Sequence, residues 1–332
     1  MRRIFATLAA TMAMTLSLTA CGDDEQPDGG RPAADRVTYL TAFGAVGRDA
    51  FAWVAQEKGY FRDAGIDVTI QLGAATGENL KVLAAGKAQF ANLDLTGAWI
   101  LAGKGQYQDV RAIAAIHQQT LVSIISLAGS AVAKPTDLEG HKLGAATGSV
   151  NQLLFPGYAK LAGIDASEVQ WVNAPPPQLP ALLAGGRVDA LSTFLIGAKG
   201  LEKAAGGKKT VVMPYSTYLP ELYGNGLIAS VSITQGNPDL ARRFRDAALK
   251  GLAYTIEHPQ EAAEIMKKAQ PAADVTAAVG EITLMTPYVK TSGVIDKQRV
   301  GTAIATLERN GLVPPGSLTP DAVVDFSLAP AG

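Results

Sequence analysis

Cysteine is almost absent from this 332-residue chain, in which Cys21 is the only one. A lone thiol cannot close an internal disulfide. The chain beyond Cys21 therefore contains no cysteine nucleophile and no cysteine metal ligand. Histidine is scarce as well, and His117, His141 and His258 do not have the spacing of an HExxH metal site.

The chain also lacks the short motifs of common enzyme classes. It contains no GxSxG elbow, and the glycines of residues 140–148 form neither a GxGxxG nor a Walker motif. Nucleotide cofactors are therefore not implied. We expect no cofactor, no metal and no catalytic residue, so that the protein binds and does not catalyse.

Neither sign of charge dominates the composition. The chain has 29 basic and 30 acidic residues, and no stripe of Lys and Arg is interleaved with aromatic residues. Nucleic acid is therefore not an expected partner. No segment after residue 20 reaches eighteen apolar residues without a charge, so we expect none of them to span a bilayer.

One apolar run does stand at the N-terminus. Arg2 and Arg3 precede an apolar run over residues 4–18, and small residues lead directly into Cys21. Residues 1–20 have the features of a signal peptide, and the cleavage region resembles a bacterial lipobox. This predicts lipid attachment at Cys21 and an extracytoplasmic, membrane-anchored protein; the alternative is an ordinary secretory signal with an incidental cysteine. Residues 21–36, which are polar and rich in Gly and Pro, would form a flexible tether.

Short apolar runs alternate with amphipathic stretches from residue 37 onward, a pattern typical of an α/β fold with mostly parallel sheets. One helix is expected over residues 48–61, ending near Gly65. The expected strands are residues 37–42, 67–72, 90–95, 110–116, 122–127, 142–145, 169–173, 190–194, 210–213 and 227–231.

An internal repeat indicates two similarly built halves. The residues AGID at 64–67 recur at 162–165, and LAAGKAQFA at 83–91 is echoed by LLAGGRVDA at 182–190. The offsets are 98 and 99 residues, and two ordered matches at nearly one offset favour two lobes over chance similarity, which is the alternative in so Ala- and Gly-rich a chain. Ligands of open α/β sheets bind outside the carboxyl ends of the strands, so two facing lobes would share a cleft.

Several of these segments resemble one family of transport proteins. They are FG at 43–44, AWVAQEKGYF at 52–61, AGIDV at 64–68, LAAGK at 83–87 and DLEGHKLG at 137–144. Together they resemble the ABC-transporter solute-binding proteins for nitrate, sulfonates, taurine and the pyrimidine precursors of thiamine. The likeness runs from residue 37 to about residue 258, and weakly beyond.

This resemblance implies a two-lobed type II periplasmic-binding-protein fold with two hinge crossings, near Ser123 and Leu227. Lobe 1 would comprise residues 37–122 plus 228–332, and lobe 2 residues 123–227. The implied partners are a small-molecule solute and ABC permease subunits, with the membrane reached through the lipid on Cys21. The protein would act as a monomer, and lobe closure over the solute would be the signal that the permease reads.

Candidate ligand-binding residues of lobe 1 follow its first strand. Phe43 could stack on a flat solute, and Arg48 or Asp49 could hold its polar edge at the start of a helix. The alternative for Arg48 and Asp49 is a solvated helix start. Asp94 and Thr96 end another strand of the same lobe.

The matching candidates of lobe 2 lie in the turn after residues 142–145. Thr147, Ser149 and Asn151 could offer hydroxyls and amides to a solute, or could simply cap the next helix. The remaining ligand-binding candidates are Thr193 and Phe194 at the end of a strand, and Tyr223 and Asn225 before the return crossing.

The sequence leaves the solute open among related classes. A thiamine pyrimidine precursor or another flat heterocycle is favoured, but the carboxylate that such binders tend to place shortly after the VDA strand is missing from residues 191–197. A sulfonate, taurine or nitrate is the alternative, although Arg48 is the only clear cation near the site. A pyrimidine-synthesis enzyme of the same fold is a further alternative, as is a sensory protein that has lost transport.

Overall fold

The computed structural model describes residues 34–330. The expected signal peptide, the lipidation residue Cys21 and most of the expected tether lie outside these residues. The first strand begins at Asp35, two residues before the position that the sequence predicts. In the described part of the chain, no helix combines the length and apolar character needed to cross a membrane.

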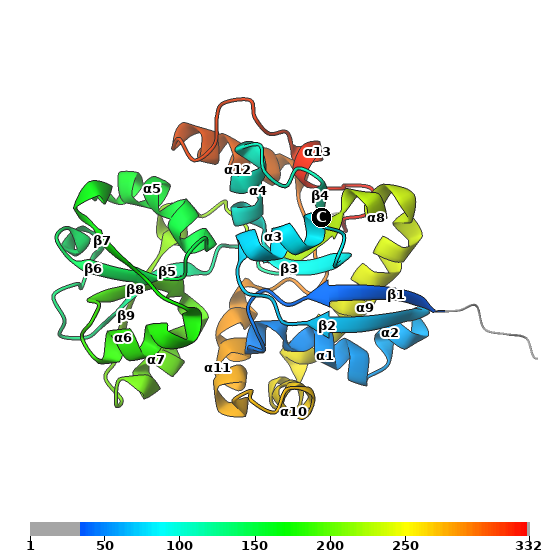
Figure 1. The fold of residues 1–332 in the computed structure, drawn as a ribbon, viewed down its shortest axis with the longest axis horizontal. Helices are drawn as coiled ribbons and strands as arrows, with labels where there is room; N and C mark the ends of the chain where they lie inside the picture. The colour runs from blue at the N-terminus through cyan, green and yellow to red at the C-terminus, as the bar shows by residue number, and fades with distance from the viewer. Residues whose placement is uncertain (1–33, 331–332) are drawn as a thin grey trace, which may run out of the picture. The chain divides into compact units, whose positions relative to one another are not determined.

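The first lobe is built on a five-stranded sheet in the order β2-β1-β3-β10-β4 (Figure 1). Strand β1 pairs in parallel with β2 and β3, whereas β10 runs antiparallel to both β3 and β4. The other four strands run in the same direction, as expected for a mostly parallel sheet, and β10 is the exception because it enters after the chain returns from the second lobe. The bounds are β1 (Asp35–Leu40), β2 (Ile66–Gln71), β3 (Phe90–Asp94), β4 (Val110–Ala115) and β10 (Asn225–Ser230).

The second lobe repeats this arrangement in the order β7-β6-β8-β5-β9. Here β6 pairs in parallel with β7 and β8, and β5 is the antiparallel member between β8 and β9. The strand that follows each crossing thus becomes the antiparallel one. The bounds are β5 (Val122–Leu127), β6 (Lys142–Ala145), β7 (Gln170–Asn173), β8 (Ala190–Phe194) and β9 (Thr210–Pro214).

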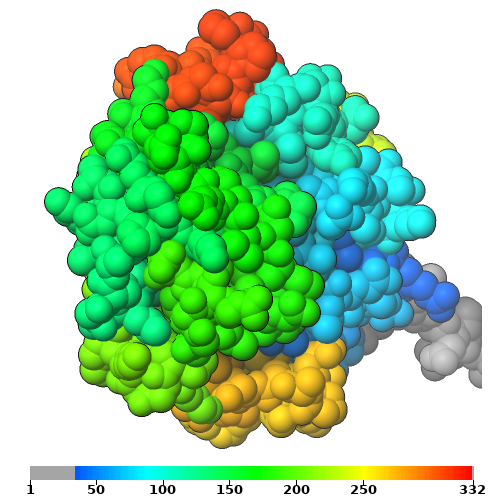
Figure 2. Space-filling model, turned by 60° about the vertical axis from the view of Figure 1, so that its left-hand side comes forward, coloured from blue at the N-terminus to red at the C-terminus, as the bar shows by residue number. Residues whose placement is uncertain are grey.

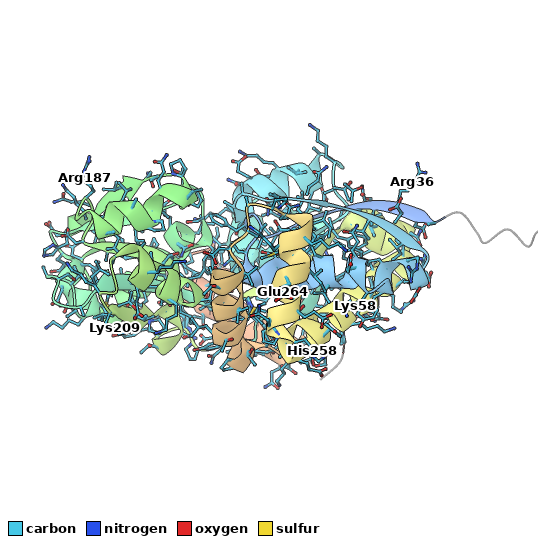
Figure 3. All side chains as sticks on the ribbon, turned by 90° about the horizontal axis from the view of Figure 1, so that it is seen from below. Arg36, Lys58, Arg187, Lys209, His258 and Glu264 are labelled. Atoms are coloured by element: carbon cyan, nitrogen blue, oxygen red, sulfur yellow. The ribbon has the colours of Figure 1, made fainter. Side chains whose placement is uncertain are left out.

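The two sheets confirm the internal repeat but change its offset. Strands β3 and β8 begin at residues 90 and 190, and Gly86 and Gly186 both have positive φ, of 69° and 66°. The sequence match at an offset of 99 is therefore wrong by one residue. Burial alternates identically over residues 81–90 and 181–190, with Arg187 exposed and projecting outward from the second lobe (Figure 3).

Helices cover both sheets. In the second lobe they are α5 (Val150–Ala162), α6 (Leu179–Ala184) and α7 (Ala198–Ala204). In the first lobe they are α1 (Ala50–Glu57), α2 (Tyr60–Asp63), α3 (Thr76–Ala84), α4 (Leu95–Gly103), α8 (Val231–Gly236), α9 (Pro238–Glu257), α10 (Pro259–Ala269), α11 (Val275–Met285), α12 (Lys297–Arg309) and α13 (Pro320–Val323). Short 3₁₀ turns complete the list: η1 (Gly47–Asp49), η2 (Pro135–Leu138), η3 (Ala166–Glu168), η4 (Pro176–Gln178), η5 (Leu195–Gly197), η6 (Tyr215–Thr217) and η7 (Thr286–Tyr288).

The helix expected over residues 48–61 is interrupted. Gly59, at φ 78°, separates α1 from α2 because a left-handed residue cannot continue an α-helix. The chain therefore turns between Glu57 and Tyr60 and places the ring of Phe61 5.2 Å from that of Phe244, in a stacked arrangement. The Phe244 ring also stacks on that of Phe90 at 3.9 Å, so α9 is anchored to the sheet by aromatic packing.

The chain changes sheet through two segments that lie side by side. Residues 116–121 connect β4 to β5, and residues 215–224 connect β9 to β10. These crossings precede the expected positions, since Ser123 is already inside β5 and Leu227 inside β10. The backbone N–H of Thr120 donates to Leu222 O at 2.8 Å, and that of Gly224 donates to His117 O at 3.1 Å. The two segments are thus hydrogen-bonded to each other.

Helix α12 holds both crossing segments. Arg299 donates to the backbone oxygen of Gln118 in the first segment and to that of Glu221 in the second. Its guanidinium also lies 4.2 Å from the centre of the Tyr223 ring. The C-terminal part of the chain therefore braces the connection between the lobes, although it contributes no strand to either sheet.

The lobes also touch on either side of their shared cleft. A Cβ added to Gly97 of α4 would lie 3.0 Å from Cβ of Val150 in α5, so these helices pack closely. Lys203 of α7 forms an ion pair of 3.3 Å with Asp274, which caps α11. Figure 2 shows the green surface of the second lobe meeting the cyan surface of the first lobe and the orange surface of residues 259–285.

We predict that Gly251→Ala destabilises the first lobe. Gly251 of α9 faces α1, and an added Cβ would lie 2.4 Å from Phe51 O, a backbone atom that cannot rotate away. Overpacking of this kind lowers the free energy of unfolding by about 1–3 kcal/mol, which urea denaturation would measure. Gly301→Ala is the matched control. Its Cβ would meet nothing closer than 3.9 Å, so the change in helix propensity should raise stability by up to about 1 kcal/mol; an equal loss in both variants would contradict the packing argument.

Candidate functional site

A cavity of about 700 Å³ lies between the carboxyl ends of the two sheets. Its first-lobe lining consists of residues 42–46, Arg48, residues 73–76, Leu93, Asp94 and Asn225, with Thr276, Ala277, Gly280 and Glu281 from α11. Its second-lobe lining consists of Ala146, residues 149–151, Pro176, Pro177, Leu179, Pro180, residues 191–194, Ile196, Gly197, residues 199–201 and Lys203. The size suits a small organic molecule.

Arg48 is the central charged group of this cavity. It is only 4% exposed, although it belongs to a short turn that opens a helix. Its guanidinium carbon lies 4.2 Å from the ring centre of Phe194, which comes from the other lobe, and 5.8 Å from that of Phe43. Aromatic faces attract a desolvated cation, so Arg48 and Phe194 form a contact across the cleft.

Asp49 stabilises the loop that carries Arg48. It is completely buried, and its Oδ1 accepts hydrogen bonds from Ala42 N at 2.9 Å and from Asn92 Nδ2 at 2.8 Å. Its Oδ2 lies 3.8 Å from Nε of Arg48. Burial raises the pKa of Asp49, and the neighbouring Arg48 opposes that rise. The alternative of a solvated helix start is therefore wrong, and Asp49 supports the cavity from behind without lining it.

Asp94 lines the cavity at the end of β3. Its Oδ1 accepts from Gly97 N at 2.9 Å and so caps α4, while its Oδ2 has no hydrogen-bond partner among the described residues. Burial raises the pKa of Asp94 to about 7, against the opposing effects of the Gly97 N–H and of Arg48. Thr96 follows in the first turn of α4, not at a strand end, and its hydroxyl donates to Tyr223 O at 2.7 Å.

The turn after β6 supplies two candidate residues of the second lobe. Ser149 donates to Ala146 O at 2.7 Å, and Nδ2 of Asn151 donates to Thr193 O at 2.8 Å. These bonds fix the turn against the end of β8, and Ser149, Asn151, Thr193 and Phe194 all line the cavity. Thr147 is exposed and does not line it.

Tyr223 also lies away from the cavity. Its ring, in the second crossing segment, packs edge-on against Trp99 at 6.0 Å and lies 4.2 Å from the guanidinium of Arg299 in α12. Asn225, two residues later, does line the cavity from the start of β10. The structure thus brings together Phe43, Arg48, Asp94, Ser149, Asn151, Thr193, Phe194 and Asn225, and it places Asp49, Thr96, Thr147 and Tyr223 outside the lining.

The sequence reasoning missed several lining residues, among them the acidic residue Glu281. Glu281 of α11 reaches the cavity from a part of the chain 234 positions beyond Gly47, whose backbone N–H donates to its Oε2 at 2.8 Å. Burial raises the pKa of Glu281 to about 7, while Arg48 opposes the rise. Residues 275–285 contain no strand end or turn motif that could have indicated a site.

Comparison with known proteins gives the family context. A family model described as NMT1/THI5 like matches residues 49–262, more than half of the chain. A formylaminopyrimidine-binding protein of Halalkalibacterium halodurans is 27% identical over 65% of this chain, and the match spans 65% of that protein's length. The riboflavin-binding protein RibY of Chloroflexus aurantiacus is 21% identical over 79% of this chain and 73% of its own length. A 4-amino-5-hydroxymethyl-2-methylpyrimidine phosphate synthase of Legionella pneumophila is 24% identical over 66% of this chain and 68% of its own length.

Solved structures share the fold. The alkanesulfonate-binding protein SsuA of Xanthomonas axonopodis pv. citri superposes with a TM-score of 0.69 at 15% identity, covering 89% of this chain and 99% of that one. The nitrate-binding protein NrtA of Synechocystis PCC 6803 superposes with a TM-score of 0.68 at 12% identity, covering 90% and 88%. The resemblance and the two-lobed periplasmic-binding-protein fold predicted from the sequence are confirmed.

We predict that Asp94→Asn changes how stability depends on pH. An unfolded aspartate has a pKa of about 3.9, whereas that of folded Asp94 is about 7. The folded state therefore binds more protons in between, and the contribution of Asp94 to stability falls as pH rises through this window. Asparagine keeps the helix cap but does not titrate. The free energy of unfolding of the variant, minus that of the wild type, should rise between pH 5 and pH 8 by on the order of 2 kcal/mol.

Urea denaturation at the two pH values measures this difference. Asp94→Ser, a second helix cap that does not titrate, should show the same rise with pH, whatever its absolute stability. A difference between variant and wild type that is the same at pH 5 and pH 8 would show that the carboxyl group is not held protonated by burial.

Proposed function

We propose that this chain, which belongs to the NMT1/THI5-like family, is the solute-binding component of an ABC importer and captures a flat nitrogen heterocycle in its interlobe cleft. The observation that carries the proposal is the charge and ring composition of the cavity. One buried guanidinium is stacked on an aromatic ring. It interacts electrostatically with Asp94 and Glu281, which line the cavity, and with Asp49, which lies behind the lining.

This balance of charge disfavours an anionic solute. Two further cations reach the lining, Lys199 and Lys203, but Lys199 is paired with Glu202 at 3.2 Å and Lys203 with Asp274 at 3.3 Å. Both of these lysine side chains are mostly exposed, so their charge is screened by solvent. A sulfonate or nitrate would therefore meet a single buried guanidinium whose charge is already balanced in part by neighbouring acidic groups, and we place these solutes second.

The aromatic groups favour a planar ligand. Phe43 and Phe194 line the cavity from opposite lobes and both lie against Arg48. A flat ring can pack on such faces and meet the polar groups at its edge. The printed names of two relatives, a formylaminopyrimidine-binding protein and a riboflavin-binding protein, support a heterocycle as the solute class.

Capture without chemistry is supported by the positions of the histidines. The chain has three, and none of them lines the cavity. His117 is fully buried near the crossing, where burial lowers its pKa to about 3, so it is uncharged at neutral pH. We therefore favour binding over a synthase activity such as that named for the Legionella relative.

Transport would follow from closure of the lobes on the solute. The two crossing segments are hydrogen-bonded to each other through their backbones. In a hinge of this kind the backbone can rotate a little while the sheets stay rigid. A ligand that contacts both lobes stabilises the closed state over the open one. A permease that docks only with the closed state would then receive loaded protein.

A ligand panel tests the proposed solute class. We predict that formylaminopyrimidine, riboflavin or a related flat nitrogen heterocycle raises the Tm of residues 22–332, because a ligand bound only by the native state stabilises it. MOPS and nitrate serve as the anionic comparison in the same thermal-shift assay. A shift with an anion and none with any heterocycle would overturn the proposal.

The same assay checks the site. Ser149 and Asn151 line the cavity. The double substitution to Ala should therefore abolish the ligand-induced rise in Tm, or lower the apparent affinity for the ligand several-fold. A shift that remains unchanged would place the ligand elsewhere.

Lipid anchoring at Cys21 is a separate part of the proposal, supported by the small residues before the cysteine and by its being the only thiol. We predict that the full chain, expressed in a bacterial host, fractionates with membranes and is released by detergent, whereas Cys21→Ser appears in the aqueous fraction or remains uncleaved. Equal membrane association of a cleaved Cys21→Ser variant would exclude the lipid as the anchor.

A further inference from the structure

Glu281 is held in a fixed position at the cavity although no short-range sequence feature places it there. Helix α11 packs against η1, and the backbone N–H of Gly47 donates to Oε2 of Glu281 at 2.8 Å. A Cβ added to Gly47 would lie 2.3 Å from Ala278 O and 2.9 Å from Cβ of Glu281, so only glycine allows this approach. The close packing fixes the carboxylate against the turn that carries Arg48.

No side chain among residues 34–330 donates to this carboxylate. The backbone N–H of Gly47 donates to Oε2, and the backbone N–H of Arg48 is a second donor to the carboxyl group. Glu281 lines the cavity and is partly exposed to it. Oε1 is therefore an acceptor that a bound ligand can reach.

Arg48 offers a hydrogen-bond donor to the same cavity. Arg48 interacts electrostatically with Glu281, and its guanidinium faces the cavity while stacking on Phe194. Its Nε is 3.8 Å from Asp49 Oδ2, which is too long for a hydrogen bond, and no described side chain accepts from its terminal nitrogens. The cavity thus presents a hydrogen-bond donor and an acceptor from two elements that pack against each other, η1 and α11.

We propose that Glu281 is a specificity-determining residue that, together with Arg48, selects ligands in which an amino or ring N–H group stands beside an acceptor atom. The edge of a 4-aminopyrimidine, with its exocyclic amine next to a ring nitrogen, has this pattern. The inference rests on the proposed function, because it concerns the edge of a heterocycle in the same cavity. A ring without the N–H would leave Oε1 buried and unpaired, which is why such sites reject analogues strongly.

The charge state of Glu281 fits this role. The groups facing it are Arg48 and Asp49 of η1, and burial raises its pKa to about 7 while Arg48 and the backbone N–H groups of η1 favour the anion. A ligand N–H that donates to Oε1 would add to the groups that favour the anion. The carboxyl group of Glu281 therefore titrates near neutral pH, and a ligand N–H group would complete its hydrogen bonding.

A pair of ligands of equal size tests the inference. The two probes are 4-amino-2-methylpyrimidine and 2,4-dimethylpyrimidine, in which a methyl group replaces the amine. We expect the wild-type protein to bind the amino ring at least about tenfold more tightly than the methyl ring, as measured by ligand-detected NMR titration. In Glu281→Gln the ratio of the two affinities should fall close to one, since the amide can still accept from Gly47 N but presents an NH₂ group to the ligand.

Glu264→Gln is the matched control. Glu264 is exposed on α10 and is labelled in Figure 3. Its Oε1 accepts from Gln260 of the same helix. This variant should keep the wild-type ratio. Because the ratio is taken within one protein, a variant that is merely less stable or less well closed would weaken both rings equally and leave the ratio unchanged.

The outcomes separate the two proposals. A wild-type protein that binds both rings equally, or a Glu281→Gln variant that keeps the wild-type ratio, overturns the role of Glu281 and leaves the heterocycle proposal intact. A wild-type protein that binds neither ring, and no heterocycle of the wider panel, overturns the proposed function and this inference with it.

Discussion

The burial of one guanidinium group shapes the site. Arg48 is 4% exposed at the carboxyl end of the first sheet, and a cation removed from water requires compensation. Asp49 gives nearby negative charge and simultaneously ties the loop to Ala42 and Asn92. Phe194 gives an aromatic face from the opposite lobe. The compensation of a single charge therefore links β1, β3 and β8, which belong to two different sheets.

The same constraint limits what the cavity can accept. Three acidic groups interact electrostatically with one buried guanidinium, and the pKa values of Asp94 and Glu281 are both raised to about 7 by burial. A further anion in this space would compete with these acidic groups for the one guanidinium, whereas a neutral or N–H-bearing ring would not. The proposed heterocycle follows from this balance and not from the fold, because proteins of this fold bind solutes as different as alkanesulfonates and nitrate.

Much of the site could be predicted because it sits at strand ends. Asp94 and Phe194 occupy equivalent ends of β3 and β8, and both line the cavity as the rule for open α/β sheets requires. Tyr223 was misplaced because its polar and aromatic character fits a site and a packed hinge equally well. Glu281 could not be found at all, since it reaches the cavity through the packing of α11 on η1. Contacts between residues 234 positions apart leave no local pattern.

The sequence by itself determined the strands and the repeat, because β-propensity and glycine turns act over a few residues. It also contains the N-terminal apolar run from which a signal peptide is predicted. All ten expected strands are present, and β5, β6 and β8 have the expected bounds. Only the tertiary structure decided that β5 and β10 are antiparallel, where the chain crosses between the sheets, and which side chains meet in the cleft. Strand direction and the pairing of Arg48 with Phe194 depend on how distant segments come together, and no short stretch of sequence carries that information.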